Sequence, residues 1–166
     1  MGGVGQDLSF IRAAGALVNN AAKTSTGVVP FAERYSRSTQ EVGQGGRRGA
    51  SMLTLDFDHG DIDYFIDAKA NTSNLTGANI SIKVRDYQMK SIIGHFEGKD
   101  IKPNNGYEVF EEDAYVSPKF LANSFKKLIK NARNFSEPGL LFWDRINEQI
   151  DSAYYHKFKP ITTNPC

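Results

Sequence analysis

A glycine-rich basic loop is the first stretch of this 166-residue chain whose residue types suit binding chemistry: it reads Gly43-Gln44-Gly45-Gly46-Arg47-Arg48-Gly49. Arginine presents a planar fork of donors that fits phosphates and base edges. No Gly-Lys-Ser or Gly-Lys-Thr follows, and the loop is expected between a helix and a strand, the reverse of a P-loop or a dinucleotide fingerprint. It is either a mobile segment whose side chains contact a nucleotide or a solvated connection with two surface arginines. Composition alone favours the second interpretation.

Cys166 is the only cysteine, and a thiol can act as nucleophile, metal ligand or radical carrier. No histidine or basic residue stands beside it in sequence to lower its pKa, and a lone cysteine is more often a small buried apolar residue. A single cysteine also excludes an internal disulfide framework and fits a reducing cytoplasm.

Histidines and aspartates give no pattern typical of a metal site. His59, His95 and His156 are scattered, whereas metal ligands need clustered spacing. An acidic cluster after the first strand has neither the glycine nor the terminal glutamate of an EF-hand loop, and it comprises Asp56, Asp58, Asp61 and Asp63. We interpret these aspartates as acids near a helix N-terminus that complement the helix dipole, and we predict no metal site.

Bulk composition indicates a cytoplasmic protein without a membrane or nucleic-acid partner. The 20 basic and 19 acidic residues leave a formal net charge of +1, which provides no electrostatic attraction to polyanions. No apolar run approaches the roughly 20 residues that span a bilayer, and no secretory signal opens the chain. The length suits one domain or part of a larger one.

The elements that would position these residues alternate between strand and helix, which predicts a parallel βα arrangement. We expect mostly loop over residues 2–27. The elements predicted after it are a helix from Val28 to about Val42, a strand at Ser51–Phe57, a helix starting at Asp58 or His59, a strand at Asn79–Val84 and a helix at Arg85–Ile93.

The second half is predicted to be mainly helical after a polar stretch at residues 94–116. Ser117-Pro118 is typical of a helix start, and the apolar stripe that follows consists of Phe120, Leu121, Phe125, Leu128, Ile129 and Ala132. Glu137-Pro138-Gly139 ends this helix. Next come an apolar core segment at Leu140–Trp143, a helix at Asp144–Ile150 and an extended stretch at Lys159–Asn164.

Eight segments in order resemble the catalytic (large) subunit of ribonucleotide reductase. They are Gly2–Gly5, Leu8–Gly15, Thr24–Gly27, Gln44–Ala50, Asp58–Ile66, Gly77–Val84, Glu137–Asp144 and Thr162–Cys166. The sequences Gly-Gly-Arg-Arg-Gly-Ala and Gly-Ala-Asn-Ile-Ser are most similar to those of the adenosylcobalamin-dependent class II branch, and class I stays open. Both chain ends look cut from the interior of a longer protein.

The resemblance implies an α/β fold: part of the reductase's parallel α/β barrel, with three or four strands and their helices. Residues 1–166 would be the N-terminal portion of that barrel, ending at the radical-cysteine loop. The implied activity is thiyl-radical reduction of ribonucleotides to deoxyribonucleotides for DNA synthesis.

By the same resemblance, Cys166 is expected to carry the thiyl radical that abstracts the ribose C3′ hydrogen, and Asn164 to orient the ribose hydroxyls. The segment from Gln44 to Ala50 is expected to relay the identity of a bound effector to the substrate base. The residues expected to contact nucleotide are Gln44, Gly45, Gly46, Arg47, Arg48 and Gly49, together with Thr24, Ser25, Thr26 and Gly27.

The implied cofactor is adenosylcobalamin, and the implied allosteric effectors are dNTPs and ATP. The expected partners are a ribonucleoside di- or triphosphate, a thioredoxin-type reductant and the remainder of the reductase chain. The family's glutamate two residues beyond the radical cysteine, and its reducing cysteine pair, are absent from this sequence, so the isolated chain is expected to be inactive. Two alternatives stay open: a non-catalytic nucleotide-binding or assembly fragment of a split reductase, and an inactive truncation, for instance from an interrupted gene. A phage source would place it in the host cytoplasm.

Overall fold

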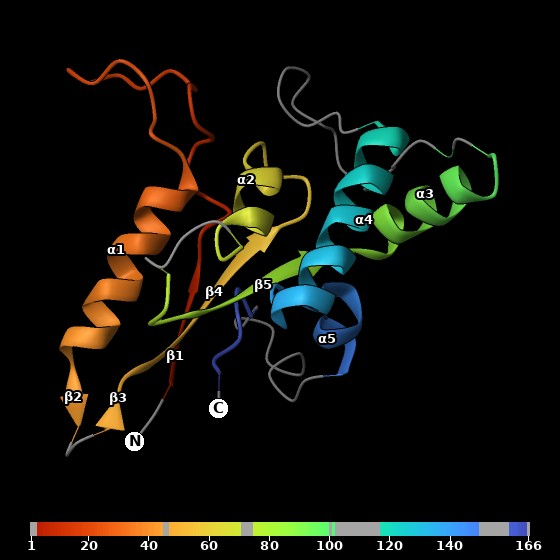
Figure 1. Cartoon of the computed structure of the whole chain (residues 1–166). Coiled ribbons are helices and arrows are strands. Elements are labelled where there is room, and N and C mark those ends of the chain that lie inside the picture. Colours follow the sequence, from red (N-terminus) through yellow and green to blue (C-terminus); the bar gives the residue numbers. More distant parts are fainter. Residues whose placement is uncertain are drawn as a thin grey trace.

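A computed structural model describes residues 3–44, 47–70, 75–99, 101, 117–149 and 160–165, with only the backbone for residues 43, 44, 47 and 48. Strands and helices alternate along the chain (Figure 1). The elements are β1 (Gly3–Asp7), α1 (Val28–Glu41), β2 (Gly43–Gln44), β3 (Arg47–Arg48), β4 (Ala50–Asp56), α2 (Ile62–Asp67), β5 (Asn79–Val84), α3 (Asp86–Phe96), α4 (Pro118–Phe135), β6 (Gly139–Phe142) and α5 (Trp143–Gln149).

Four strands form one parallel sheet in the order β1-β4-β5-β6. Helix α1 connects β1 to β4, α2 connects β4 to β5, and the segment containing α3 and α4 connects β5 to β6. Within the described residues the sheet is open, with β1 and β6 at its edges. This confirms the predicted α/β fold with a partial parallel barrel.

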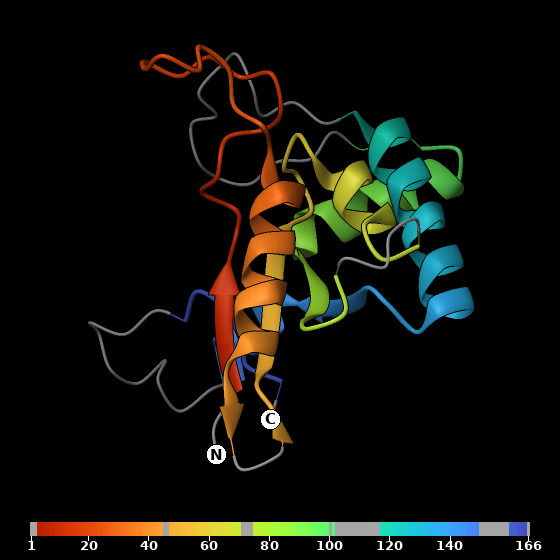
Figure 2. The same cartoon turned by 60° about the vertical axis from the view of Figure 1, so that its left-hand side comes forward.

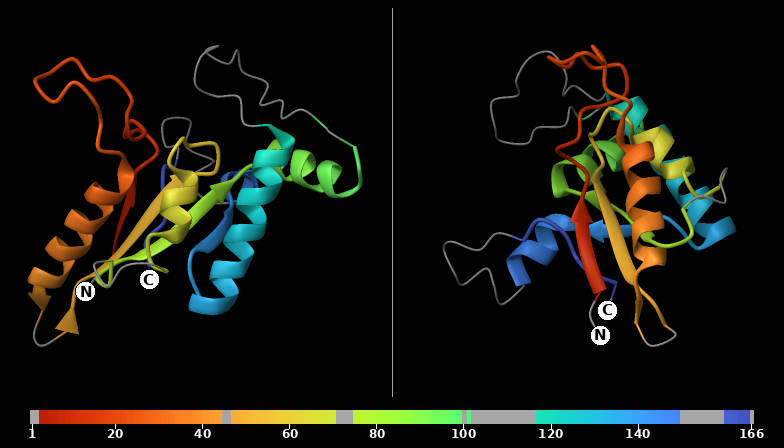
Figure 3. Two further views of the ribbon diagram at one scale, coloured as in Figure 1. Left: turned by 45° about the horizontal axis from the view of Figure 1, so that its top comes forward. Right: turned by 90° about the vertical axis from the view of Figure 1, so that its left-hand side faces the viewer.

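Helices cover one face of the sheet. Figure 2 shows α1 lying along β1 and β4, and α2, α3 and α4 complete the layer. Its core is formed by apolar residues of these helices and of β4 and β5, among them Val28, Ala32, Leu53, Leu55, Ile62, Phe65, Ile80, Ile82, Ile92, Leu121 and Leu128. The right panel of Figure 3 shows α5 and the C-terminal segment on the other side of the sheet from α1. We call this second side the open face.

Strand β1 is the main error of the sequence-based prediction, which expected loop over residues 2–27. Gly3, Gly5 and the polar Gln6 and Asp7 carry no strand pattern, yet all of β1 pairs in parallel with β4, from Gly3 opposite Ala50 to Asp7 opposite Thr54. Its hydrogen bonds come from a neighbour far along the chain, which local propensity does not register.

Most other elements confirm the predictions, with small shifts at the ends. The helix expected from Asp58 or His59 begins only at Ile62, because residues 57–61 form a turn in which His59 N–H donates to Asp56 O and Ile62 N–H to His59 O. The glycine-rich loop expected at residues 43–49 contains the short antiparallel pair β2–β3. The apolar segment after Pro138 contains the edge strand β6.

Helix α4 begins as predicted: the Ser117 side chain accepts from Phe120 N–H at 3.2 Å, with Pro118 at the first position. Leu121 and Leu128 of its stripe are buried, whereas Phe120 and Ile129 are partly exposed. No helix among the described residues is long and apolar enough to cross a membrane.

Candidate functional site

Alternation along β1, β4 and β5 places polar residues on the open face. In β4, Leu53 and Leu55 face the helices, so Thr54 and Asp56 face the other way. Lys83 holds the equivalent position in β5, opposite Asp56, and Asp7 lies opposite Thr54. The open face therefore carries a compact group of polar and charged side chains at the carboxyl ends of three neighbouring strands.

Lys83 stands at the centre of this group and is only 3% exposed. Its Nζ lies 2.9 Å from Asp7 Oδ2 and 3.2 Å from Asp56 Oδ1, and 5.1 Å from the centroid of the Trp143 ring. Arg85 adds a second cation 3.6 Å from Asp56 Oδ1. Two acids and two bases thus balance in charge, as a buried ionic group requires.

Asp56 is the less well paired of the two acids in the group. Burial raises the pKa of its carboxyl above the ordinary value, although the nearby Lys83 and Arg85 charges act in the opposite direction. Its Oδ1 is buried and makes no hydrogen bond of good geometry, so the contact with Lys83 is electrostatic. Asp7, in contrast, accepts hydrogen bonds from Lys83 and from the Ser9 hydroxyl.

The C-terminal segment, residues 160–165, lies across this face and touches three strands in turn. Lys83 of β5 donates to the Ile161 carbonyl at 3.3 Å, the hydroxyls of Thr54 in β4 and Thr162 lie 2.8 Å apart, and Gly5 of β1 stands against Thr163. A Cβ on Gly5 would collide with the Thr163 carbonyl. Consecutive residues of the segment therefore contact β5, β4 and β1 in order.

Asn164 follows these contacts and is exposed. Cys166, two positions further, lies outside the described residues. The structure thus locates one of the two predicted catalytic residues directly beside the anchored segment.

The predicted nucleotide-binding residues fall into two separated groups. Gln44, Arg47 and Arg48 belong to the β2–β3 hairpin after the C-terminus of α1, and Gly45 and Gly46 lie outside the described residues. The second group precedes the N-terminus of α1, which has 14 residues, or about 21 Å at 1.5 Å per residue. Within this chain the two groups do not meet at one site (Figure 1).

In the second group, residues 24–27, polar groups already have partners in the chain. The Ser25 hydroxyl donates to Arg12 O at 2.8 Å and accepts from Gly27 N–H at 3.1 Å. Thr24 forms a bridge with Leu17. Gly27 has a φ of 82° immediately before α1, a conformation in which glycine is favoured. Thr26 lines a cavity between α1 and α2.

The four clustered aspartates have different partners, which corrects their joint assignment to a helix N-terminus. Asp56 belongs to the open-face group, and Asp58 accepts from the Tyr87 hydroxyl at 2.8 Å. Burial, followed by the charge of Asp58, raises the pKa of Tyr87. Only Asp63 lies in the first turn of α2, where it accepts from the Ser124 hydroxyl. No group of three or more potential metal ligands occurs in the described part of the chain.

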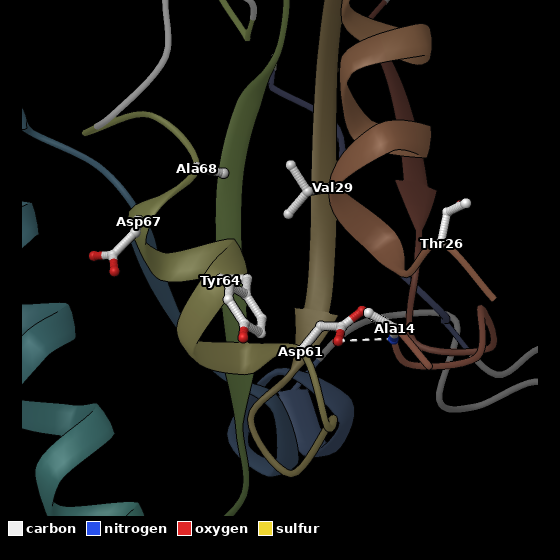
Figure 4. A pocket seen from close by; sticks show the side chains of 7 residues that line it. All are labelled: Ala14, Thr26, Val29, Asp61, Tyr64, Asp67 and Ala68. Atoms are coloured by element: carbon white, nitrogen blue, oxygen red, sulfur yellow. Dashed lines mark hydrogen bonds between the residues drawn. The ribbon is translucent and has the colours of Figure 1, made fainter. Parts of the chain in front are cut away.

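Asp61 is buried and supports the start of α1 rather than of α2. Its carboxylate accepts from Val28 N–H at 2.9 Å and from Ala14 N–H at 2.9 Å. Figure 4 shows it at one end of a cavity of about 470 Å³ between α1 and α2, lined also by Thr26, Val29, Tyr64, Asp67 and Ala68. The lining combines apolar groups with the carboxylates of Asp61 and Asp67, whose negative charges would repel the phosphates of a nucleotide.

Replacing Asp61 by alanine is expected to lower the free energy of unfolding by about 2 to 4 kcal/mol, because two buried N–H groups would lose their acceptor. Asp61→Asn keeps one acceptor oxygen and should lose about half as much. Urea unfolding followed by circular dichroism measures both. Equal stability of Asp61→Ala and the parent would show that the carboxylate contributes nothing to the start of α1.

His59 lies in the turn before α2 and joins it to the segment that contains Ile11. Its Nε2 lies 2.6 Å from Ile11 O, and its Nδ1 accepts from Asp61 N–H at 3.0 Å. Both ring nitrogens are thus engaged, although the side chain lines a hollow of about 850 Å³ beside residues 9–17.

Sequence reasoning missed the open-face group, Asp7, Thr54, Asp56 and Lys83. The strand predicted at Asn79–Val84 is confirmed as β5, but no role was predicted for Lys83 within it. The signal that could have shown otherwise is the position of Asp7 and Asp56, each at the last residue of a strand in the same parallel sheet.

Comparisons with known proteins agree with this architecture. The model of the family described as "Ribonucleotide reductase, barrel domain" matches residues 1–166. A solved structure, the Actinobacillus ureae class Id ribonucleotide reductase alpha subunit, aligns with a TM-score of 0.61 at 19% identity over 88% of this chain and 22% of its own. At that identity the likeness supports the fold.

Sequence relatives match along the whole chain. The vitamin B12-dependent ribonucleoside-diphosphate reductase of Mycobacterium tuberculosis H37Rv is 33% identical over 99% of this chain. The enzyme of the same name from Thermoplasma acidophilum is 29% identical over 99%, and the ribonucleoside-diphosphate reductase large subunit of Variola virus is 33% identical over 44%. The chain spans about a fifth of the length of the first two relatives. With the family model matching from end to end, the chain belongs to the ribonucleotide reductase barrel-domain family, and its whole-length relatives favour the class II branch.

Proposed function

We propose that this chain is the portion of a ribonucleotide reductase barrel that ends at the radical-cysteine loop, and that the complete enzyme reduces ribonucleotides to deoxyribonucleotides. The observation that carries the proposal is the anchored segment at residues 160–165, which crosses the open face and contains the exposed Asn164. In a chain of this family, that segment leads to the thiol of Cys166.

Roles follow for two residues. Cys166 carries the thiyl radical that abstracts the ribose C3′ hydrogen, since an S–H bond is weak enough to be broken and remade in each turnover. Asn164 orients the ribose hydroxyls through its amide. The charged group beneath contributes no proton transfer to substrate, because Lys83 and Asp7 are buried under the segment.

Effector recognition is proposed for Gln44 and the residues from Gly45 to Gly49, with dNTPs and ATP as ligands. The position of the β2–β3 hairpin after α1 and its two arginines support this role, because arginine binds phosphate in two-point contacts. A second contact with nucleotide is proposed for Thr24, Ser25, Thr26 and Gly27, mainly through the Thr24 and Thr26 hydroxyls. The Ser25 hydroxyl and the N–H groups of Thr24, Ser25 and Gly27 already have partners within the chain.

Adenosylcobalamin is proposed as the radical generator of the complete enzyme, on the names of the two whole-length relatives. Among the described residues, the histidine that lines the larger hollow, His59, has both ring nitrogens engaged and therefore offers no ligand to a cobalt ion. No step is therefore assigned to cobalamin on residues of this chain. A thioredoxin-type reductant and a cytoplasmic location complete the proposal.

The test is an assay of the complete polypeptide that contains residues 1–166. Supplied with a ribonucleoside di- or triphosphate, a dithiol and adenosylcobalamin, it should form the deoxynucleotide, and the isolated chain should form none. Turnover by the isolated chain would contradict its incompleteness. If no assembly turns over and the isolated chain binds a dNTP, the nucleotide-binding alternative replaces the catalytic one.

A further inference from the structure

We infer that Lys83 is a positioning residue of the reductase: its ammonium holds the Ile161 carbonyl and thereby sets the place of the segment that carries Asn164 and leads to Cys166. The structural part of the inference, the anchoring of the segment, rests on the geometry of the open face. Its kinetic part, the effect on turnover, also rests on the proposed function.

Three oxygens surround the ammonium of Lys83: Asp7 Oδ2 and the Ile161 carbonyl oxygen accept hydrogen bonds from it, and Asp56 Oδ1 attracts it by charge. Asp7 Oδ2 lies at 2.9 Å, Asp56 Oδ1 at 3.2 Å and the Ile161 carbonyl oxygen at 3.3 Å. The two carboxylates belong to the sheet and the carbonyl to the segment. Lys83 thus joins the segment to β1 and β4 as well as to its own strand.

Burial makes this link rigid. The side chains of Lys83 and Asp7 are 3% and 4% exposed, and the Trp143 ring covers the ammonium from the side of α5. An ion pair in such surroundings is screened far less by solvent than one at the surface. A planar guanidinium would present its donors in one plane, so arginine is a poor substitute for this three-way contact.

Among these contacts of the described residues, the one from Lys83 comes first in chain order, ahead of the Thr54–Thr162 hydroxyl pair and the approach of Thr163 to Gly5. Without the contact between Lys83 and Ile161, the segment would depend on the contacts of Thr162 and Thr163. A displacement of about 1 Å at a reacting group can reduce turnover by about a hundredfold, so a fixed start of the segment matters for the thiol.

Charge balance and positioning can be separated by two variants. Lys83→Met alone leaves Asp7 and Asp56 with only Arg85 and should destabilise the chain. Lys83→Met combined with Asp7→Asn restores the balance, because one acid and one base remain, but it provides no ammonium for Ile161. Lys127→Met is the matched control, since Lys127 pairs with Asp67 in the helix layer.

The structural measurement is the ¹⁵N order parameter of Thr162 and Thr163 in the full 166-residue chain. We expect about 0.85 in the parent and in Lys127→Met, and below about 0.6 in Lys83→Met and in the double variant. A double variant with the parental order parameter would show that Lys83 only balances charge. A parent already below about 0.6 would also overturn the anchor.

The kinetic measurement uses the complete reductase. In the double variant kcat should fall by about a hundredfold while KM for the ribonucleotide stays within about twofold. Unchanged kcat with a mobile segment would overturn the positioning role. If the complete parent enzyme has no turnover, the proposed function fails, and the order parameters decide the anchor independently.

Discussion

Replacing Cys166 by serine in the complete reductase is expected to reduce deoxynucleotide formation by at least about a thousandfold, equivalent to about 4 kcal/mol in the activation barrier. Serine has nearly the same shape, but its O–H bond is too strong for a radical to form on oxygen. The measurement is the initial rate of product formation at saturating ribonucleotide. Substrate affinity should stay close to that of the parent, because the change is confined to one atom.

Asn164→Ala provides the matched comparison on the same segment. It removes the amide proposed to orient the ribose but keeps the thiol, so its loss should be smaller, about ten- to a hundredfold. If Cys166→Ser retains a rate within tenfold of the parent, Cys166 is not the radical carrier, and the proposed catalytic role of the segment fails with it.

The sequence predicted the strands whose side chains meet the helices. In β5 the alternation of Ile80, Ile82 and Val84 is a local signal, because each apolar residue packs against the helix layer. Strand β1 could not be predicted in this way. Its position depends on pairing with β4, which lies 47 residues further on, as Gly3 opposite Ala50 shows.

Only part of the candidate site could be predicted from the sequence. Cys166 and Asn164 were identified through the resemblance of Thr162–Cys166 to the family, and no local pattern around them indicated chemistry. Lys83 and Asp7 were missed because they are 76 residues apart in sequence. A buried ion pair between such distant residues follows from strand order and register, neither of which composition or periodicity reveals.

The acidic cluster illustrates the opposite error. Asp56, Asp58, Asp61 and Asp63 lie within eight residues of the sequence and were interpreted as one feature. The chain leaves a strand, turns and enters a helix within these residues, so each carboxylate points to a different partner: Lys83, Tyr87, the start of α1 and Ser124 respectively. Their proximity in sequence suggested a shared role, but the backbone changes direction between them and separates their side chains.

The glycine at position 5 is also explained by a distant residue, Thr163, which lies 158 positions later in the chain. The strand needs no glycine here for backbone reasons, and valine has a higher strand propensity. What excludes a side chain is the carbonyl of Thr163, which occupies the place of a Cβ on the open face. Gly5 therefore leaves the space on β1 that the C-terminal segment occupies.

Gly5→Val is accordingly expected to displace residues 161–164 and to lower kcat of the complete reductase by about a hundredfold, while strand β1 stays paired with β4. Val4→Ala is the control: it alters the same strand on its other face, where the side chain is 58% exposed, and should leave kcat unchanged. Circular dichroism and urea unfolding separate displacement from loss of fold, since valine should cost the sheet itself little. Parental kcat in a folded Gly5→Val enzyme would mean that the segment can move away from β1 without disturbing the thiol, and that the contacts from Lys83 and Thr54 alone fix its position.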